Sequence, residues 1–186
     1  MDSKKGIYLA LILVYLIGTG FSIESSDNTF QKEFQKDWNY FSAPIADRSN
    51  PQISSLFNES EDVNSIWTYD NGEWKNYNPE APTNEFNSLR GGRGYLLDSK
   101  SDFTWSPDIN TELGGDSLEE GTPGQERVEQ GWNLVGHFWN ENKTRSNALG
   151  SLSSEIVASV YGPSKESGLD LQTLSDSDKM ESGSAY

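Results

Sequence analysis

Aromatic side chains that could stack against a flat ring stand on both sides of an Asn-Gly pair. Trp67 and Tyr69 precede Asn71-Gly72, and Trp74 follows it. Asn-Gly between two aromatic-rich runs predicts a two-residue hairpin turn with positive φ, in which Tyr69 faces Trp74. The three aromatic side chains then share one face, and they are the candidate glycan-binding residues because aromatic faces stack on sugar rings. The alternative is that this face is core, the commoner place for strand aromatics.

A possible calcium loop begins at Asp108. Oxygen-bearing side chains alternate there with others, and Asp108, Asn110 and Glu112 are the candidate ligands. A standard calcium loop needs Gly at its sixth position and Glu at its twelfth, whereas here Leu113 is sixth and Glu119 is twelfth. A solvated acidic loop therefore explains the pattern better. Ca²⁺ is the one cofactor that the sequence leaves open.

Two Asn-x-Ser/Thr triplets begin at Asn58 and Asn142. Both are predicted N-glycosylation sites, which are credible in an exported chain. The alternative is that they arise by chance in a sequence rich in Asn and Ser.

No catalytic residue is predicted. His137 is the single histidine, and the chain has no Gly-x-Ser-x-Gly motif, so a Ser-His-acid triad cannot be argued. His137 is expected to be a structural histidine at a strand edge. Gly91-Gly92-Arg93-Gly94 lacks the Lys-Ser/Thr and the following helix of a phosphate loop, and it predicts a turn.

Charge and cysteine content narrow the possible partners. The chain has 29 acidic and 14 basic residues, a net charge of −15, which opposes binding to nucleic acid or anionic lipid. Such a surface suits high salt, where charge repulsion is screened, as in a halophilic archaeon. The chain has no cysteine, which excludes disulfides and thiolate metal sites.

The N-terminal segment indicates export. Lys4 and Lys5 precede an apolar run over residues 7–17, and small residues follow at 18–22. This pattern predicts a signal peptide over residues 1–22, because a membrane span needs about 20 apolar residues. The alternatives are an uncleaved anchor and a pilin-type processing site. The protein is therefore expected to be secreted or at the cell surface, with membrane contact only through this segment.

The rest of the chain predicts a mainly β fold with short helices, of the α+β class. Residues 23–36 are expected to be a linker, 37–107 a first β-rich unit, 108–125 an acidic Gly-rich linker, and 126–186 a second unit. In the first unit the expected strands are Trp38–Ile45, Val63–Tyr69, Trp74–Tyr77, Tyr95–Asp98 and Phe103–Trp105, with a short helix at Pro51–Asn58 and a helical turn at Asn84–Leu89.

Landmarks of the first unit recur in the second. Ordered landmarks with weak identity predict two tandem, diverged units, and chance similarity is the alternative. Leu174 is expected to take the place of Leu89. Because the second unit has no counterpart of the strands that follow Tyr95, it is expected to be incomplete and the sequence to be a fragment. The matched residues are Trp38-Asn39 with Trp132-Asn133 and Ile66-Trp67 with Val160-Tyr161, each 94 residues apart, and Gly92 and Tyr95 with Gly183 and Tyr186, each 91 apart.

Three stretches of the first unit and one of the second resemble a β-rich repeat module of secreted surface proteins in archaea and bacteria. That module opens with Gly-Trp-Asn-Leu and closes with Gly-x-Gly-Tyr-Trp, and residues 131–137 are similar to haloarchaeal members. The first unit departs from the pattern at Asp37, which stands in place of the opening Gly. The resemblance covers residues 37–186 and implies a surface module without known catalytic residues. The similar stretches are 38–45, 65–79, 92–95 and 131–137.

These features together predict a non-catalytic structural or interaction module of a secreted or cell-surface envelope protein. Its expected partners are cell-envelope proteins or polysaccharide, and not nucleic acid. The leading alternative is an accessory glycan-binding region of an extracellular polysaccharide-active enzyme. A calcium-stabilised adhesin is the third possibility.

Overall fold

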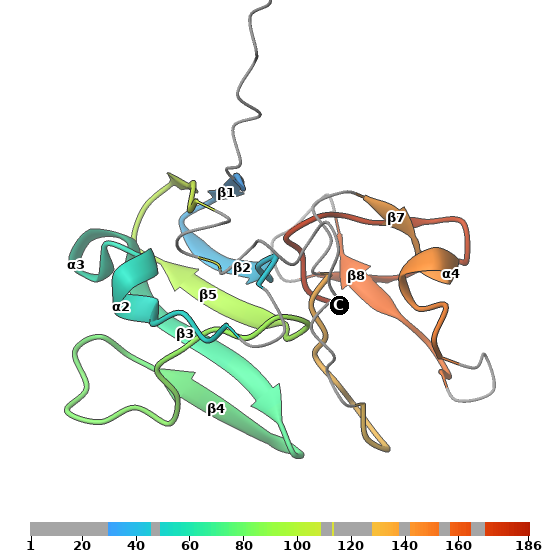
Figure 1. Cartoon of the computed structure of the whole chain (residues 1–186), viewed down its shortest axis with the longest axis horizontal. Helices are drawn as coiled ribbons and strands as arrows, with labels where there is room; N and C mark the ends of the chain where they lie inside the picture. Colours follow the sequence, from blue (N-terminus) through green and yellow to red (C-terminus); the bar gives the residue numbers. More distant parts are fainter. Residues whose placement is uncertain are drawn as a thin grey trace, which may run out of the picture.

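The computed structural model describes residues 30–45, 49–108, 113, 128–137, 142–152, 157–164 and 170–186. This part of the chain is mainly β with a few short helices, as the sequence predicts. The expected signal segment and most of the expected acidic linker at 108–125 lie outside the described residues. Figure 1 shows a twisted sheet in the first part of the chain and shorter elements from residues 142–186 beside it.

The central element is a four-stranded antiparallel sheet in the order β2-β5-β3-β4. Its strands are β2 (Asp37–Phe41), β3 (Val63–Asp70), β4 (Glu73–Tyr77) and β5 (Tyr95–Ser99). Alternate residues of β5 are buried, as expected for a strand with one face toward the core. The expected strands in this region are thus confirmed, although β2 ends at Phe41, before the predicted limit.

The β3-β4 hairpin has the predicted turn and register. Asn71 and Gly72 have φ values of 53° and 81°, which a two-residue turn of this kind requires. Tyr69 pairs with Trp74, as expected. The opposite face carries Ile66, which is fully buried. The core therefore lies behind the hairpin, and the three candidate glycan-binding aromatics lie on its other face.

The core is covered by α2 (Ile53–Leu56), α3 (Glu59–Asp62) and a small sheet of β1 (Lys32–Phe34) and β6 (Phe103–Trp105). Phe34 packs against Phe41 and Phe103 at ring-centroid distances of 5.3 and 4.9 Å. Phe30 and Phe34 are almost completely buried. The C-terminal part of the segment expected to be a linker, residues 23–36, is therefore a core element, because its two phenylalanines fill the space beside Trp105.

Two local expectations for the first unit are corrected. The helix expected at Pro51–Asn58 is shorter, and α3 follows it. The helical turn expected at Asn84–Leu89 does not form, because Ser88 bridges Gln52 and the Leu89 N–H donates to the Pro51 carbonyl at 3.0 Å. Leu89 is nevertheless fully buried, as expected for its inward position.

The second part of the chain has shorter elements. They are β7 (Lys143–Thr144), α4 (Arg145–Ala148), β8 (Tyr161–Pro163), β9 (Leu171–Thr173) and β10 (Lys179–Met180). The second Trp-Asn pair, Trp132-Asn133, does not lie in a strand. Val135 and Gly136 make only isolated bridges there, and Trp132 is 72% exposed. A small buried cluster of Val160, Leu174 and Met180 supports this part.

One hydrogen-bonded loop occurs in both parts. The Asn39 side chain donates to the Gln35 carbonyl at 2.7 Å and accepts from the Gln35 N–H at 3.0 Å. Asn133 makes the same two bonds to Glu129, both at 2.9 Å. Each loop also contains a residue with positive φ. This residue is Asp37 (75°) in the first loop and Gly131 (111°) in the second. Outside these loops, Gly92 (80°) and Gly183 (73°), which are 91 residues apart, also have positive φ.

The closing tyrosines and the short helices also have matching contacts. The hydroxyl of Tyr95 accepts from the Arg90 N–H at 2.8 Å, and the hydroxyl of Tyr186 accepts from the Glu181 N–H. The first residue of α2 and the first residue of α4 each donate the backbone N–H to a carbonyl of a segment more than 30 residues later in the chain. Ile53 N–H donates to Asn87 O at 2.9 Å, and Arg145 N–H donates to Asp178 O at 2.8 Å.

Leu174 is placed differently from the expectation. Its N–H donates to the Val160 carbonyl at 2.9 Å, so it continues the pairing of β8 with β9. This is the position that Tyr77 has opposite Ile66 in the first sheet. Leu174 therefore does not take the place of Leu89.

The two parts meet through reciprocal backbone contacts. The Ser42 N–H donates to the Gly183 carbonyl at 3.0 Å, and the Gly136 N–H donates to the Gly92 carbonyl at 2.9 Å. Gly183 of the second part thus lies against Ser42 of the first part, and Gly92 of the first part lies against Gly136 of the second. The Ser42 hydroxyl adds a bond to the Ser184 carbonyl at 3.0 Å.

Candidate functional site

The candidate site is the outer face of the four-stranded sheet. Trp67 and Trp74 lie there with Trp38 of β2 and Leu96 of β5, and these four side chains line an open hollow of about 300 Å³. The register explains the grouping, because Trp67 stands opposite Leu96, which neighbours the pair formed by Trp38 and Asp98. Residues two apart along one strand share a face, and so do residues directly opposite each other on adjacent strands.

Tyr69 extends this aromatic surface toward the turn. Its ring meets that of Trp74 edge-on at 5.3 Å, with an angle of 66° between the planes. Trp74 is 49% exposed, which leaves a large part of its indole open to a ligand. The Trp67 indole N–H is already used, since it donates to the Ser65 hydroxyl at 3.0 Å. Trp67 therefore contributes its ring face to this surface and not a free donor.

All three sequence-predicted glycan-binding residues are brought together on this face. Sequence reasoning missed Trp38 and Leu96, which the wider sheet adds. The two-residue periodicity of a strand could have indicated Trp38, because Phe41, three residues further along β2, is fully buried and an odd spacing places the two side chains on opposite faces. Leu96 gave no comparable signal, since its place depends on β5 entering between β2 and β3.

Polar side chains lie at the margin of the aromatic face. Asn76 pairs with Trp67, and Asp98 pairs with Trp38, so both project on the same side of the sheet as the indoles. Both are partly exposed. Aromatic rings flanked by amide and carboxylate groups can hold a ligand with one apolar face and polar edges. Asp98 is the one carboxylate among the side chains named on this face.

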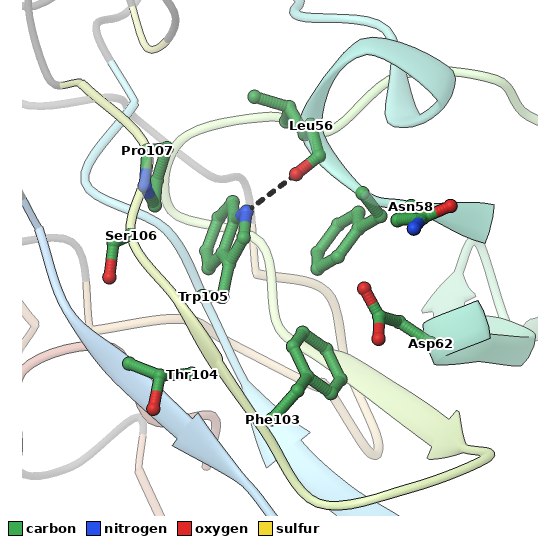
Figure 2. A pocket seen from close by; sticks show the side chains of 9 residues that line it. Leu56, Asn58, Asp62, Phe103, Thr104, Trp105, Ser106 and Pro107 are labelled. Carbon is green, nitrogen blue, oxygen red and sulfur yellow. Dashed lines mark hydrogen bonds between the residues drawn. The ribbon is translucent and has the colours of Figure 1, made fainter.

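A second hollow, of about 200 Å³, lies between α2-α3 and the β6 segment. Figure 2 shows Trp105 and Phe103 on one side of it and Asp62 with Asn58 on the other. The Trp105 indole N–H donates to the Leu56 carbonyl at 2.8 Å. Asp62 is the one carboxylate among the residues that line this hollow, so it has no acid-base partner there.

The pKa of Asp62 is raised, first by burial and then by the neighbouring Glu61. The Asn58 carbonyl, hydrogen-bonded by the Asp62 N–H at 2.8 Å, belongs to the turn that holds this carboxylate in place. A raised pKa on a lone carboxylate does not by itself constitute a catalytic site.

The two sequon asparagines are both exposed. Asn58 donates its side-chain amide to Glu61 at 2.9 Å, and Asn142 accepts from the Ser182 N–H at 2.8 Å through its side-chain oxygen. The amide nitrogen of Asn142 is the atom that would be glycosylated. Glycosylation at either site stays a prediction.

The candidate calcium ligands fall largely outside the described residues. Asp108 is described, whereas Asn110 and Glu112 are not. Among the described residues no group of three or more His, Cys, Asp or Glu side chains could hold a metal ion. Calcium binding therefore remains a prediction from the sequence.

His137 is buried at the contact between the two parts of the chain. Its N–H donates to the Ser184 carbonyl at 2.9 Å, and its carbonyl accepts from the Ser42 hydroxyl at 2.8 Å. Only 2% of the residue is exposed. The geometry gives His137 a place in packing and not at a reactive surface.

No family model, curated protein or solved structure matches this chain. None of the helices in the described ranges has the length and apolar character needed to cross a membrane.

Proposed function

We propose that this chain is a non-catalytic structural or interaction module of a secreted or cell-surface envelope protein. The observation that carries the proposal is the aromatic face of the four-stranded sheet, where Trp74 is 49% exposed beside Trp38 and Trp67. A contiguous apolar patch on the surface of a soluble domain commonly marks an interaction site. With a net charge of −15, a partner of the envelope protein or polysaccharide class suits this face better than nucleic acid or anionic lipid.

The proposed module consists of two tandem, diverged units of the Gly-Trp-Asn-Leu type. The repeated side-chain loops of Asn39 and Asn133 support this organisation, because each residue binds the backbone four positions earlier. The reciprocal bonds of Ser42 and Gly136 support it as well. Chance similarity of two β segments would not be expected to reproduce local hydrogen bonds at nearly constant spacing.

A second candidate function is glycan binding as an accessory region of a polysaccharide-active enzyme. The placement of Asn76 and Asp98 beside the indoles favours it. Sugar rings present an apolar face of C–H groups and a rim of hydroxyls, which matches aromatic rings edged by amide and carboxylate groups. The two candidates differ in the partner and share the same face.

The experiment is a binding assay of the full chain with Trp74→Ala on isolated cell envelopes of the source organism. Leu171→Ala is the matched control, since it removes another 49% exposed apolar side chain, from β9. We expect Trp74→Ala to weaken binding by about tenfold or more, the loss of roughly 1.4 kcal/mol of ring contact. Leu171→Ala should bind like the parent chain, and circular dichroism should show both variants folded.

Treatment of the envelopes separates the two candidates. Protease treatment should abolish binding if the partner is an envelope protein, whereas periodate oxidation of sugars should abolish it if the partner is a glycan. Equal binding of Trp74→Ala and the parent chain would contradict a role for the aromatic face in either function.

A further inference from the structure

The outer side of the four-stranded sheet carries a single charged group among its paired residues. Residues directly opposite each other on adjacent strands share a side of the sheet, as do residues two apart along one strand. Asp98 stands opposite Trp38 and lies two residues beyond Leu96, so it is on the same side as the indoles. The paired residues on this side, from Trp38 of β2 to Asn76 of β4, include no Lys or Arg. The charge of this face is therefore negative.

The hollow on this face has the size of one small group. Its volume is about 300 Å³, and three indoles and Leu96 line it. Sites for drug-sized ligands begin at about 300 Å³. The Trp67 indole N–H donates to the Ser65 hydroxyl at 3.0 Å, and this bond holds the ring in place. The hollow thus matches a single side chain of a partner, which would lie against aromatic faces.

Aromatic faces beside a carboxylate favour a cation. A cation within about 6 Å of a ring centroid is attracted by the ring quadrupole, and Trp attracts it most strongly of the aromatic side chains. Asp98 adds a full negative charge at the margin of the hollow. None of the ion pairs between described residues uses Asp98, so this part of the chain does not neutralise its charge. The net charge of −15 acts in the same direction, because it attracts a basic partner over a longer range.

Arginine fits these features better than the other cations do. Its guanidinium is planar, stacks on aromatic faces and gives two parallel N–H bonds to a carboxylate such as that of Asp98. A lysine ammonium is more strongly hydrated, and it costs more to bring against indoles. A quaternary ammonium group has no N–H donor and leaves the oxygens of Asp98 without a bond. A neutral sugar ring gains nothing from the charge of this face.

We propose that this hollow receives an arginine side chain from a protein of the cell envelope. The guanidinium lies among the indoles of Trp38, Trp67 and Trp74, and it donates to the carboxylate of Asp98. Trp, Tyr and Arg are the residues most enriched at the energetic centres of protein interfaces. The inference rests on the proposed function and deepens it, because it names the class of partner and the group that the aromatic face recognises.

The first test uses the full chain with N-acetyl-L-arginine amide as the probe. N-acetyl-L-citrulline amide is its matched control, since it keeps the planar shape and removes the charge. In spectra that correlate the indole nitrogen with its hydrogen, arginine amide should shift the signals of Trp38, Trp67 and Trp74. Trp105, which is buried in the core, is the internal reference that should not shift. Citrulline amide should bind at least about tenfold more weakly, a loss of about 1.4 kcal/mol.

Asp98→Asn tests the carboxylate. It removes the charge and nearly keeps the shape, so it should weaken binding of arginine amide by about tenfold or more and leave citrulline amide unchanged. Glu33→Gln is the control for net charge, because Glu33 is exposed and lies on β1, in the small sheet with β6. It should bind both probes like the parent chain. The same indole spectra show whether each variant is folded.

The third test uses isolated envelopes, as in the assay of Trp74→Ala. Phenylglyoxal, which modifies arginine side chains, should reduce binding of the parent chain by about tenfold or more, because it removes the central contact. Acetic anhydride, which acetylates lysine side chains, should leave binding unchanged. Periodate oxidation of the envelope sugars should also leave it unchanged.

The inference is wrong if arginine amide and citrulline amide bind equally, or if Asp98→Asn and Glu33→Gln bind arginine amide equally. It is also wrong if tetramethylammonium binds as tightly as arginine amide, which would indicate a cage for ammonium groups, or if envelope binding survives phenylglyoxal. Each of these results is compatible with weaker envelope binding by Trp74→Ala, and the proposed function would then stand without the arginine. If Trp74→Ala binds envelopes like the parent chain, the proposed function fails and this inference fails with it.

Discussion

At the scale of single residues, Lys32 is a side chain whose environment opposes its charge. Its ammonium group donates to the Ser184 hydroxyl at 3.2 Å, and burial lowers its pKa, an effect that the nearby charge of Glu181 partly offsets. In the unfolded chain the pKa returns to about 10.5. The folded protein therefore binds this proton less tightly than the unfolded chain does.

The resulting prediction concerns pH. Between the lowered pKa of Lys32 and about 10.5, the unfolded chain holds more protons, so the free energy of unfolding should rise with pH by at most about 1.4 kcal/mol per unit. Lys32→Met should remove this slope, and Lys36→Met, at an exposed position, should retain it. Urea unfolding at pH values from 7 to about 10.5 measures the difference.

Tyr186 must be considered in the same pH range. Burial raises its pKa to about 12, so its contribution to stability is present below about pH 10 and is lost as pH rises toward 12. This contribution is common to the parent chain and both lysine variants, and it cancels when they are compared. Equal slopes in Lys32→Met and the parent chain would show that the amine is not desolvated in the fold.

At the scale of elements, the β3-β4 hairpin depends on its turn. Gly72 has a φ of 81° and nothing within 4 Å of the position where a Cβ would stand. Gly72→Ala should therefore destabilise through the backbone alone, by about 1–2 kcal/mol. The measurement is urea unfolding, with the exposed Glu73→Ala as the control at the next position. A Gly72→Ala variant as stable as Glu73→Ala would contradict the turn geometry.

The same hairpin shows what sequence alone can predict. The Asn-Gly pair and the alternation around it are local signals, and they gave the register of Tyr69 with Trp74 correctly. The small sheet of β1 and β6 could not be predicted in this way, because Phe34 pairs with Phe103 across a long stretch of chain. Polar neighbours conceal the role of Phe34, and tertiary contacts decide it.

The residues of the candidate site also fall into those that a local signal predicts and those that only tertiary contacts place. The face shared by Trp67, Tyr69 and Trp74 follows from one turn, and the sequence predicted it. Trp38 and Leu96 join that face only because the strand order is β2-β5-β3-β4, which no local pattern encodes. Long-range strand order therefore accounts for the residues that sequence reasoning missed.

At the scale of the whole molecule, reciprocal packing joins the two parts of the chain. Gly136 lies at this contact, and a Cβ there would stand 2.4 Å from the Arg93 carbonyl oxygen and 2.5 Å from the Ser42 Cβ. Both neighbours belong to segments with their own backbone bonds across the contact, so neither can move without losing pairing. The close approach of the two backbones thus requires a glycine at this position.

Gly136→Ala should therefore destabilise the protein by about 1–3 kcal/mol, the usual cost of forcing an extra methyl group into a packed interior. Gly150→Ala is the matched control, since its added Cβ would meet only the Ser146 and Asn147 carbonyl oxygens, at 3.3 and 3.5 Å. Thermal unfolding followed by circular dichroism should give a lower midpoint for Gly136→Ala alone. Because the reciprocal bonds hold the parts together, loosening them should also separate one cooperative transition into two. Equal midpoints for the two variants would mean that the contact contributes nothing to stability, and the parts would then be independent bodies on one chain.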